Sequence, residues 1–170
     1  MPNILITGSP RVGKTTLIND LIGNLSKNCI GMVTNEIRKD GRRTGFQIET
    51  LSGSAFILAS KQNLSSRYRV SSYGVYVENV VKVVKLLEEE IKKEVPEIII
   101  IDEIGKMELF SSSFKKFLED CLDTQKVLGT IMFKDSEYSE IIKDRKDTEV
   151  FLLTRDNREM IKNEIMRRMK

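Results

Sequence analysis

Residues 8–15 read Gly8-Ser9-Pro10-Arg11-Val12-Gly13-Lys14-Thr15 and match the pattern G-x-x-x-x-G-K-[ST] at every fixed position. The short apolar run before them, PNILIT at residues 2–7, is typical of a buried strand. Residues 14–27 follow with apolar side chains at helical spacing, namely Leu17, Ile18, Leu21, Ile22 and Leu25. The sequence therefore places this pattern, known as Walker A, between a strand and a helix, which is the context that it requires.

The glycine-containing turn has the spacing of a phosphate-binding loop. Gly8 and Gly13 allow the backbone to curl so that successive N–H groups point inward. The helix that begins near Lys14 adds its positive end. Lys14 can reach the β and γ phosphates, and the hydroxyl of Thr15 can ligate Mg²⁺. We therefore predict a nucleotide-binding loop at residues 8–16, in which Thr16 either contacts the α-phosphate or is a plain residue of the first helical turn.

A second candidate motif is the run EIIIID at residues 97–102, which is continuously apolar until it ends in an acid, as expected of a central parallel strand. An acid at the carboxyl end of such a strand projects over the ligand-binding edge of the sheet. Asp102 is therefore the candidate Walker B partner of Mg²⁺, through water, because Mg²⁺ keeps several waters. Glu103 is expected to hold a water against the γ-phosphate as a general base. The alternative is that Asp102 caps the next turn and Glu103 is solvated.

The pattern changes after the first helix to three short β-like runs, CIGMVTNEI, TGFQIETL and SAFILA. Asp40-Gly41 joins the first two runs and is a strong hairpin signal, and a Ser-Gly pair joins the second two. We predict an antiparallel β-meander near residues 29–59, inserted early in the domain. The polar residues 60–74 are expected to form a surface loop.

The rest of the chain alternates between helical and strand patterns. Apolar side chains at helical spacing predict a helix within residues 75–95, although many of them are valines. Further elements are expected in this order: a helix at 111–122 with a serine cap, a strand at 127–133, a short helix at 136–144, a strand at 149–153 and a closing helix capped by Thr154. Such alternation indicates an α/β fold, a mostly parallel sheet flanked by helices. With no linker or repeat, we predict a single domain over residues 1–170.

Composition excludes several kinds of chemistry. The chain has no histidine, so Ser-His-Asp catalysis, Cys-His catalysis and a His-containing zinc site cannot be built. Carboxylates, Lys, Arg, hydroxyls, backbone amides and a bound metal remain, and phosphoryl transfer uses these groups. The two cysteines, Cys29 and Cys121, lie in separate apolar segments and are expected to be buried thiols in a reducing compartment.

Charge and hydropathy bear on the partners and the location. The net charge of +3, from 28 basic and 25 acidic residues, gives no reason to expect a nucleic acid or a membrane as partner. No run of about 18 apolar residues is present, so we expect no transmembrane helix. The amino-terminal residues lack the basic region and cleavage site of a secretory signal. We expect a cytoplasmic protein. Its oligomeric state is open, with a monomer favoured.

Several stretches resemble the THEP-type nucleoside-triphosphatases, the family that includes the cancer-related NTPase. They are GSPRVGKTTL, TNEIR followed by RTGF, SSYGV, DEIGKMELFS and LTRDNR, and they span nearly the whole chain. DEIGKMEL is far more specific than a phosphate loop. The resemblance implies a RecA-like P-loop core with an additional catalytic glutamate. It also implies Mg²⁺-dependent hydrolysis of ATP, GTP, CTP and UTP to the diphosphate and phosphate.

The resemblance also implies roles for particular residues. Gly8 and residues 13–16 match the family's phosphate loop, Asp102 its Walker B acid and Glu103 its catalytic glutamate. The sequence departs from the family at Arg11, where glycine is usual. If this position requires a positive φ, Arg11 is strained; if not, its guanidinium can lie near the phosphates.

An arginine that stabilises charge on the γ-phosphate strongly accelerates hydrolysis. Arg43, in the RTGF stretch, is the first candidate for this catalytic role, ahead of Arg38 and Arg11. The alternative is a solvated arginine at the end of a strand. Lys106 and Glu108 are expected either to form a surface ion pair or to help close the site.

The nucleobase pocket is poorly specified by the sequence. Residues 155–158, between the last expected strand and its helix, are expected to lie where a base could bind, with Arg155 or Arg158 either stacked on it or solvated at the start of a helix. Tyr73 is either a loop anchor or a stacking ring. No Asn-Lys-x-Asp guanine motif is evident.

Three functions compete for this set of motifs. An adjacent Asp-Glu pair favours hydrolysis, because a hydrolase needs an ordered water where a kinase places an acceptor hydroxyl. We therefore predict a nucleoside-triphosphatase of low base selectivity. The main alternative is a small P-loop kinase, with residues 60–74 as a lid bearing Arg67 and Arg69. A third is an RNA-binding or regulatory switch, against which the small net charge, the 6% aromatic content and the lack of tryptophan argue.

Overall fold

The apolar run before the glycine-containing turn forms strand β1 (Asn3–Thr7), which is buried along its whole length. The computed structural model describes residues 1–169. Strand β8 (Val127–Ile131) pairs with one edge of β1 and strand β9 (Thr148–Leu152) with the other, both in parallel. The predicted strand–turn–helix unit is confirmed, because α1 (Lys14–Asn24) follows the turn directly.

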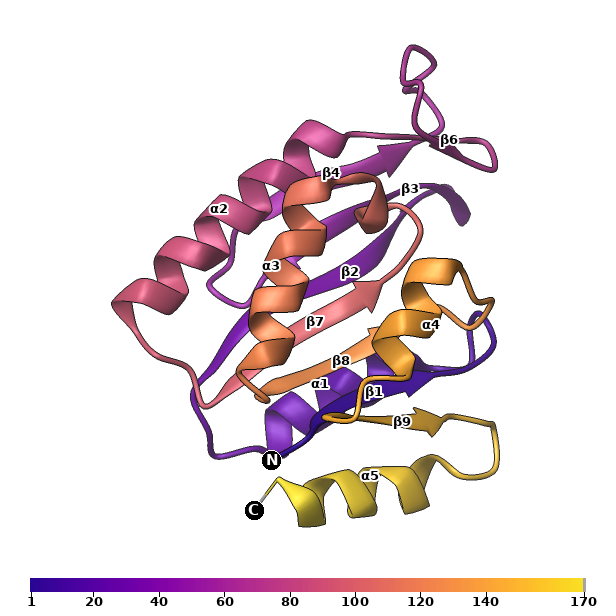
Figure 1. The fold of residues 1–170 in the computed structure, drawn as a ribbon. Coiled ribbons are helices and arrows are strands. Elements are labelled where there is room, and N and C mark those ends of the chain that lie inside the picture. Colours follow the sequence, from indigo (N-terminus) through magenta and orange to yellow (C-terminus); the bar gives the residue numbers. More distant parts are fainter. Residues whose placement is uncertain (170) are drawn as a thin grey trace.

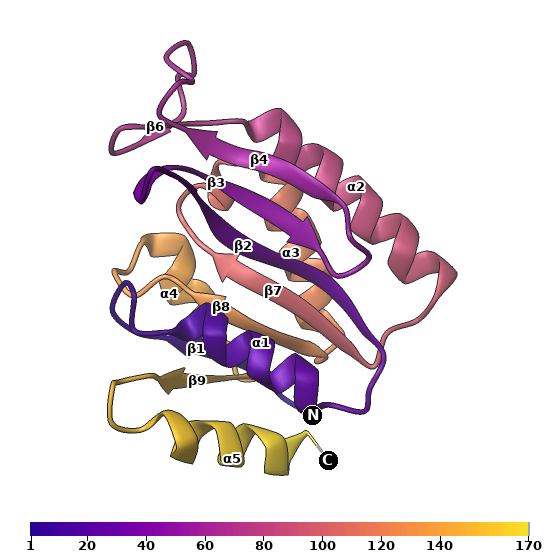
Figure 2. The same cartoon turned by 180° about the vertical axis from the view of Figure 1, so that it is seen from behind.

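The strands form one twisted sheet, drawn from its two faces in Figures 1 and 2. Its parallel part consists of β2 (Cys29–Lys39), β7 (Ile98–Ile104), β8, β1 and β9. The antiparallel part consists of β3 (Arg42–Thr50), β4 (Ala55–Ser60), β6 (Tyr73–Val75) and β5 (Arg69–Val70). The strand order is β5-β6-β4-β3-β2-β7-β8-β1-β9. The predicted α/β fold with a mostly parallel central sheet is confirmed.

The predicted antiparallel meander is confirmed, but its description as an insertion is wrong. Asp40 and Gly41 form the hairpin turn with φ angles of 51° and 73°, both positive as a two-residue type I′ turn requires. The first half of β2, however, pairs in parallel with β7, where Val33 lies opposite Asp102. Because this half is apolar and buried, it belongs to the central sheet, and only its polar second half extends past the sheet as a hairpin.

The prediction of a plain surface loop at residues 60–74 is also wrong. Strands β5 and β6 form a short hairpin there, and β6 adds to the edge of β4. Tyr73 is buried and its ring lies 5.1 Å from the ring of Phe46, so it is a loop anchor. Such short strands in a polar segment carry no alternation that sequence reasoning could detect.

Helices cover both faces of the sheet. α2 (Val77–Lys93) and α3 (Ser112–Asp123) lie on one face (Figure 1), and α1 and α5 (Arg158–Arg168) lie on the other (Figure 2). The short helices η1 (Glu108–Phe110) and α4 (Glu137–Lys143) follow β7 and β8. No helix within residues 1–169 is long and apolar enough to cross a lipid bilayer.

Of two N-caps predicted from the sequence, one is confirmed and one is wrong. Ser111 caps α3 as predicted, because its hydroxyl accepts a hydrogen bond from the N–H of Phe114. Thr154 does not cap the closing helix, since α5 begins later and its N-cap is Asn157. The amide side chain of Asn157 bonds to the Thr154 N–H and to the Leu152 carbonyl. These bonds hold residues 152–157 in a turn before the helix starts.

The alternation of side chains along β7 positions the acidic pair. Ile98 and Ile100 pack in the core beneath α1 and α5, and Ile99 and Ile101 pack in the core beneath α2 and α3. Asp102 is therefore directed to the α1 side, where the helix following the phosphate loop begins. The pairing of β7 with β8 becomes irregular between residues 101 and 104. The acids thus lie where the strand leaves the sheet, at its carboxyl edge.

Candidate active site

The loop between β1 and α1 has the backbone of an anion-binding turn. Gly13 is the N-cap of α1 with φ of 101°, a left-handed conformation that glycine adopts without steric cost. The N–H of Val12 donates to the Ser9 carbonyl at 3.2 Å and closes the turn. The Nζ atom of Lys14 donates to the Gly8 carbonyl at 2.9 Å, so the ammonium group lies within the loop. Residues 8–15 therefore form the predicted curled loop at a helix N-terminus.

Arg11 adopts the strained conformation that was one of the two expectations for it. Its φ is 65°, in the left-handed region that a side chain with a Cβ atom disfavours by roughly 1–2 kcal/mol. The side chain is exposed, so packing does not demand arginine here. The loop therefore contains local strain that a glycine at this position would not have.

We expect the stability of Arg11 variants to follow this backbone conformation. Arg11→Gly should be at least as stable as the wild type, because relief of the left-handed strain offsets the greater freedom of glycine in the unfolded chain. Arg11→Val should lose about 1 kcal/mol or more, because a β-branched residue is least tolerated at positive φ. Urea unfolding of the three proteins measures the difference. Equal stability of the valine variant would contradict the strain.

Arg158 links the closing helix α5 to the phosphate loop. Its guanidinium donates to the Gly13 carbonyl at 3.2 Å and forms an ion pair with Asp20 of α1 at 2.6 Å. The sequence suggested either base stacking or solvation for this residue, and the structure shows neither. It shows a link from α5 to the end of the phosphate loop, which sequence reasoning missed because Asp20 and Arg158 are distant in the chain.

Asp102 lies fully buried beside the start of α1. Its Oδ1 atom accepts a hydrogen bond from the hydroxyl of Thr130 on β8. Its Oδ2 atom is the one buried side-chain oxygen or nitrogen within residues 1–169 that has no hydrogen-bond partner. Burial raises the pKa of Asp102, while the hydroxyls of Thr130 and Thr15 and the charge of Lys14 act against this rise.

These donors fit a magnesium ion. A buried carboxylate oxygen without a partner is costly unless a cation or a bound water satisfies it. The Thr15 hydroxyl lowers the pKa of the same carboxyl group, so the two oxygen ligands expected from the sequence lie close together. Hard oxygen donors with few carboxylates are what Mg²⁺ prefers.

Glu103 is the next residue, joined to Asp102 by a cis peptide bond, and it is partly buried. Burial and the charge of Asp102 raise the pKa of Glu103, while the charge of Lys14 lowers it. The charge of Lys14 therefore lowers the pKa of both acids. The structure brings Lys14, Asp102 and Glu103 to one place, as the spacing of the motifs predicts.

Glu108 does not form the surface ion pair that was one expectation for it. Its side chain is only 3% exposed, whereas Lys106 lies in solvent. Burial first, and then the charge of Glu103, raise the pKa of Glu108 to about 8. Its Oε1 atom lies 3.5 Å from the hydroxyl of Thr34 at the end of the buried half of β2. A third carboxyl group therefore lies beside the two predicted ones.

A cavity of about 450 Å³ adjoins the phosphate loop. Phe133 and Leu152, which are 49% and 52% exposed, form its apolar wall at the ends of β8 and β9. Arg155 lines it as well, in the region where the sequence suggested a base could bind. The other lining residues are Ser9, Pro10, Arg11, Val12, Leu153 and Thr154.

Arg43, the first candidate for a catalytic arginine, lies on the hairpin beyond the sheet. Its guanidinium donates to the Tyr73 hydroxyl and to Glu36, each at 2.9 Å, and it lies 5.0 Å from the centre of the Phe46 ring. Arg38 also bonds to Glu36. Neither arginine makes a hydrogen bond or ion pair to the phosphate loop within the described part of the chain.

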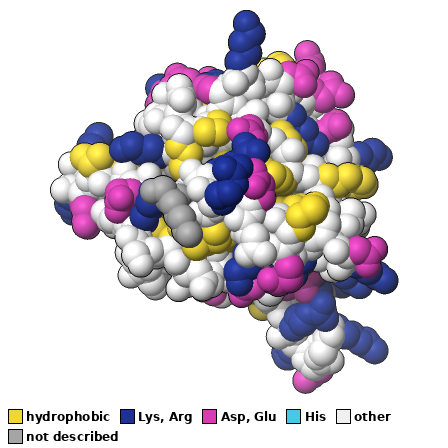
Figure 3. Space-filling model, turned by 90° about the horizontal axis from the view of Figure 1, so that it is seen from below, with side chains coloured by type: hydrophobic (Ala, Val, Ile, Leu, Met, Phe, Trp, Pro, Cys, Tyr) yellow, Lys and Arg dark blue, Asp and Glu magenta, His cyan; other side chains and the backbone are white. Residues whose placement is uncertain are grey.

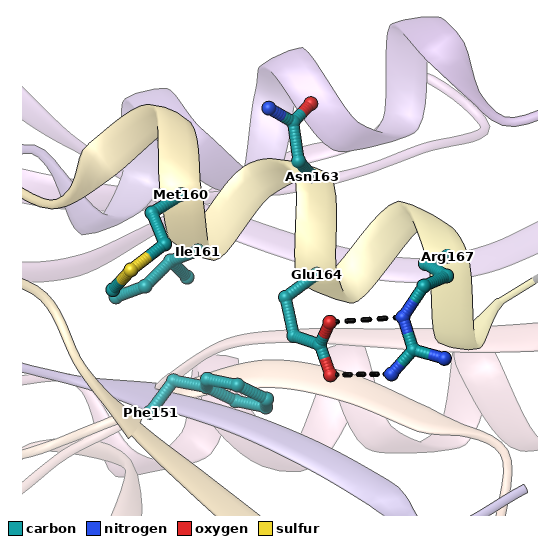
Figure 4. A pocket seen from close by; sticks show the side chains of 6 residues that line it. All are labelled: Phe151, Met160, Ile161, Asn163, Glu164 and Arg167. Atoms are coloured by element: carbon teal, nitrogen blue, oxygen red, sulfur yellow. Dashed lines mark hydrogen bonds and ion pairs between the residues drawn. The ribbon is translucent and has the colours of Figure 1, made fainter.

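A larger hollow of about 510 Å³ lies between α5 and β9, away from the loop. Figure 3 shows the face of the molecule that carries these two elements, where charged and apolar side chains are interspersed. The hollow lies over Phe151, Met160 and Ile161, and the Glu164–Arg167 ion pair lies at one side of it (Figure 4). None of its lining residues belongs to residues 8–15, and none of the acids described above faces it.

A Walker A loop at the carboxyl edge of a parallel sheet, with a buried acid directed at its threonine, defines the class of P-loop nucleotide-binding proteins. Within this class, the model of the family described as NTPase matches residues 3–166. The chain belongs to this family of nucleoside-triphosphatases, which are enzymes.

Similar proteins support this assignment over nearly the whole chain. The chain is 44% identical over 165 residues to a nucleoside-triphosphatase THEP1 from Thermotoga sp. (strain RQ2), covering 96% of this chain and 92% of that protein. It is 36% identical to a cancer-related nucleoside-triphosphatase homolog from Mus musculus, covering 96% and 94%. A crystal structure of THEP1 from Aquifex aeolicus is similar with a TM-score of 0.85 and 36% identity, covering 100% and 99%. The resemblance to the THEP-type family is confirmed.

Sequence reasoning missed two site residues, Thr130 and Thr34, and the role of a third, Arg158. Thr130 is a single hydroxyl within the apolar strand β8, and Thr34 lies at the end of the buried half of β2. A polar residue inside a continuous apolar strand was the available signal for Thr130, because a buried hydroxyl needs a partner. Which partner it finds depends on the order of strands in the sheet.

Proposed function

We propose that this protein hydrolyses nucleoside triphosphates to the diphosphate and phosphate in a reaction that requires Mg²⁺. The observation that carries the proposal is that the charge of Lys14 lowers the pKa of two adjacent carboxyl groups, the buried Asp102 and the partly buried Glu103. A phosphate chain bound by the N–H groups of residues 8–15 would have its γ-phosphate beside these three groups. The arrangement suits an attack by water rather than transfer to a large acceptor.

Thr15 and Asp102 would hold the metal ion. A bound Mg²⁺ would neutralise negative charge on the β and γ phosphate oxygens. The hydroxyl of Thr130 donates to one oxygen of Asp102, and the other oxygen, which has no partner within residues 1–169, would be the one available to the metal ion. Thr130 thereby fixes the orientation of the carboxylate.

Glu103 and Lys14 perform the chemical step. The oxygen of a water molecule attacks the γ-phosphorus, and its proton passes to the carboxylate of Glu103. The bond between the γ-phosphorus and the β–γ bridging oxygen breaks, and its electrons stay on the diphosphate. Lys14 stabilises the negative charge that develops on the phosphate oxygens.

Arg43 is retained as the proposed catalytic arginine. It lies on the hairpin that extends past the same edge of the sheet as the phosphate loop (Figure 1). To contact a γ-phosphate, its guanidinium must leave Glu36. The Arg43–Glu36 ion pair is partly exposed, so breaking it costs little free energy. Arg11, which lines the cavity next to the loop, is the alternative that needs no such exchange.

Low selectivity for the base follows from the walls of the cavity beside the loop. Phe133 and Leu152 offer apolar surface, which any base can cover with its ring face. No carboxylate or carboxamide side chain is among the residues that line this cavity in the described structure. Strong discrimination between bases needs buried polar groups that a wrong base leaves unpaired. We therefore propose that ATP, GTP, CTP and UTP are all substrates.

The test is phosphate release from each of the four nucleotides, without an acceptor, in Mg²⁺ and after chelation with EDTA. We expect kcat/KM values that differ by no more than about 10- to 200-fold, because a cavity of this kind distinguishes similar ligands by only about 1–3 kcal/mol. EDTA should abolish release of phosphate. Release that appears only when a hydroxyl acceptor is added would establish a kinase instead. Slow release that RNA accelerates would establish a switch.

A further inference from the structure

Glu108 is a buried acid that the proposed reaction does not use. It is only 3% exposed and belongs to the single-turn helix η1, which follows β7 after a tight turn through Gly105. A carboxyl group in such a place is costly to ionise unless a cation or several hydrogen bonds compensate it. Its one side-chain hydrogen-bond partner within residues 1–169 is the Thr34 hydroxyl at 3.5 Å. A purely structural role would be served as well by an apolar side chain.

The carboxyl group of Glu108 points to Glu103. A methyl group placed on Gly105 would lie 2.7 Å from Oε1 of Glu103 and 2.9 Å from Oε2 of Glu108. The two oxygens are therefore close to the same point, and the absence of a side chain on Gly105 is what allows both to be there. The described atoms form no direct hydrogen bond between the two groups. The remaining distance is one that a small rotation or a single water can bridge.

We propose that Glu108 is a positioning residue that donates a hydrogen bond to Glu103, directly or through one water, and so holds the general base against the attacking water. This inference rests on the proposed hydrolytic role of Glu103. With one oxygen of Glu103 bound by Glu108, the other oxygen is presented to the attacking water. The hydrogen bond requires that Glu108 carry its proton when Glu103 is ionised.

The charges around Glu108 favour that protonation state. The ionisable groups acting on it are Glu103 and Asp102, both on β7 and both negative when ionised. The Thr34 hydroxyl, from β2, is a weaker influence in the opposite direction. Lys14, from α1, acts on Asp102 and Glu103. Two carboxyl groups that share a site do not ionise together readily, so the one without a nearby cation keeps its proton.

Two variants of Glu108 separate positioning from packing. Glu108→Gln keeps the shape and an N–H donor, so its kcat at pH 7 should stay within about 3-fold of the wild type. Glu108→Met keeps the length but has no donor, so its kcat should fall about 10- to 100-fold, the effect of one lost charge-assisted hydrogen bond. KM should change little in both, because neither variant alters the phosphate loop. Glu89→Gln, an exposed acid on α2, is the matched control and should behave as the wild type.

The pH profile gives a readout that a structural role would not change. Wild-type kcat should decline at alkaline pH as Glu108 loses its proton, and Glu108→Gln should lack this decline because its amide does not ionise. Thermal unfolding supplies a second readout without catalysis. Because the pKa of Glu108 is raised to about 8 from 4.5, its favourable contribution is complete below pH 4.5 and is lost as the pH rises to 8. As the pH rises over this range, the melting temperature of Glu108→Gln should therefore increase relative to that of the wild type.

Three results would overturn the inference. They are a wild-type kcat in Glu108→Met, an equal loss of kcat in Glu108→Gln and Glu108→Met, and an alkaline decline that persists in Glu108→Gln. A folded Glu108→Met protein, shown by its melting temperature, keeps the first comparison valid. If the wild type itself releases no phosphate, the proposed function fails, and that result is distinct from any of the three.

Discussion

Glu103→Gln should lower kcat for phosphate release by about 10²- to 10⁴-fold, the usual contribution of a positioned general base. The glutamine has the same shape and can still contact the attacking water, but it cannot accept the proton. The affinity for nucleotide and Mg²⁺ should be retained, because in the proposed site Thr15 and Asp102, not Glu103, hold the metal, and residues 8–15 bind the phosphates. Single-turnover phosphate release measures the chemical step, and titration with a fluorescent nucleotide measures the affinity.

Two results with Glu103→Gln would contradict the proposed role of Glu103. If Glu103→Gln releases phosphate at the wild-type rate, Glu103 is not the general base. Glu108 then has no general base to position, and that inference fails too. A parallel loss of affinity would place Glu103 among the metal-binding groups instead. Glu89→Gln controls for the loss of one negative charge elsewhere on the protein.

Lys14→Ala should have the other large effect, on both binding and turnover. Nucleoside triphosphate affinity should fall roughly 10- to 100-fold, which corresponds to a lost hydrogen bond to a charged group of about 1.5–3 kcal/mol. The rate of the chemical step should fall by a further 10²- to 10³-fold, as expected when one donor that stabilises transition-state charge is removed. Isothermal titration and single-turnover kinetics separate the two effects.

Folding of the Lys14→Ala protein is not expected to suffer. Within residues 1–169, the Nζ atom of Lys14 makes hydrogen bonds only to the carbonyls of Gly8 and Ser9, in the loop between β1 and α1. Lys116→Ala removes an equal charge from a highly exposed position on α3 and should leave both measurements unchanged. Unaltered affinity and turnover in Lys14→Ala would refute the phosphate-binding role of the loop, and the proposed hydrolysis with it.

The elements with strong local signals were predicted well. β1 and α1 follow from an apolar run and a 3.6-residue period, and the hairpin at residues 40–41 follows from an Asp-Gly pair that tolerates positive φ. The hairpin of β5 and β6 was not predicted, because its five residues carry no alternation. The N-cap of α5 was assigned to Thr154 rather than Asn157, because both are good cap residues and only the geometry of the turn distinguishes them.

The candidate site shows the same division. Lys14, Thr15, Asp102 and Glu103 are recognisable because their chemistry is tied to short motifs. The environment of Glu108 is not, since a charged residue shortly after the end of a strand is usually solvated. Its burial depends on α2 and α3 covering that face of the sheet, which no local pattern states.

The sequence by itself determined the phosphate loop, the strand that ends in two acids, the alternation of strands and helices and the family, because each depends on residues that are neighbours in the chain. Only the tertiary structure decided that β8 lies between β1 and β7, that Thr130 holds Asp102, that Arg158 fastens the loop and that Glu108 faces Glu103 across Gly105. Those contacts join segments that are far apart or folded back on themselves. They form only when the whole sheet assembles and its faces are buried.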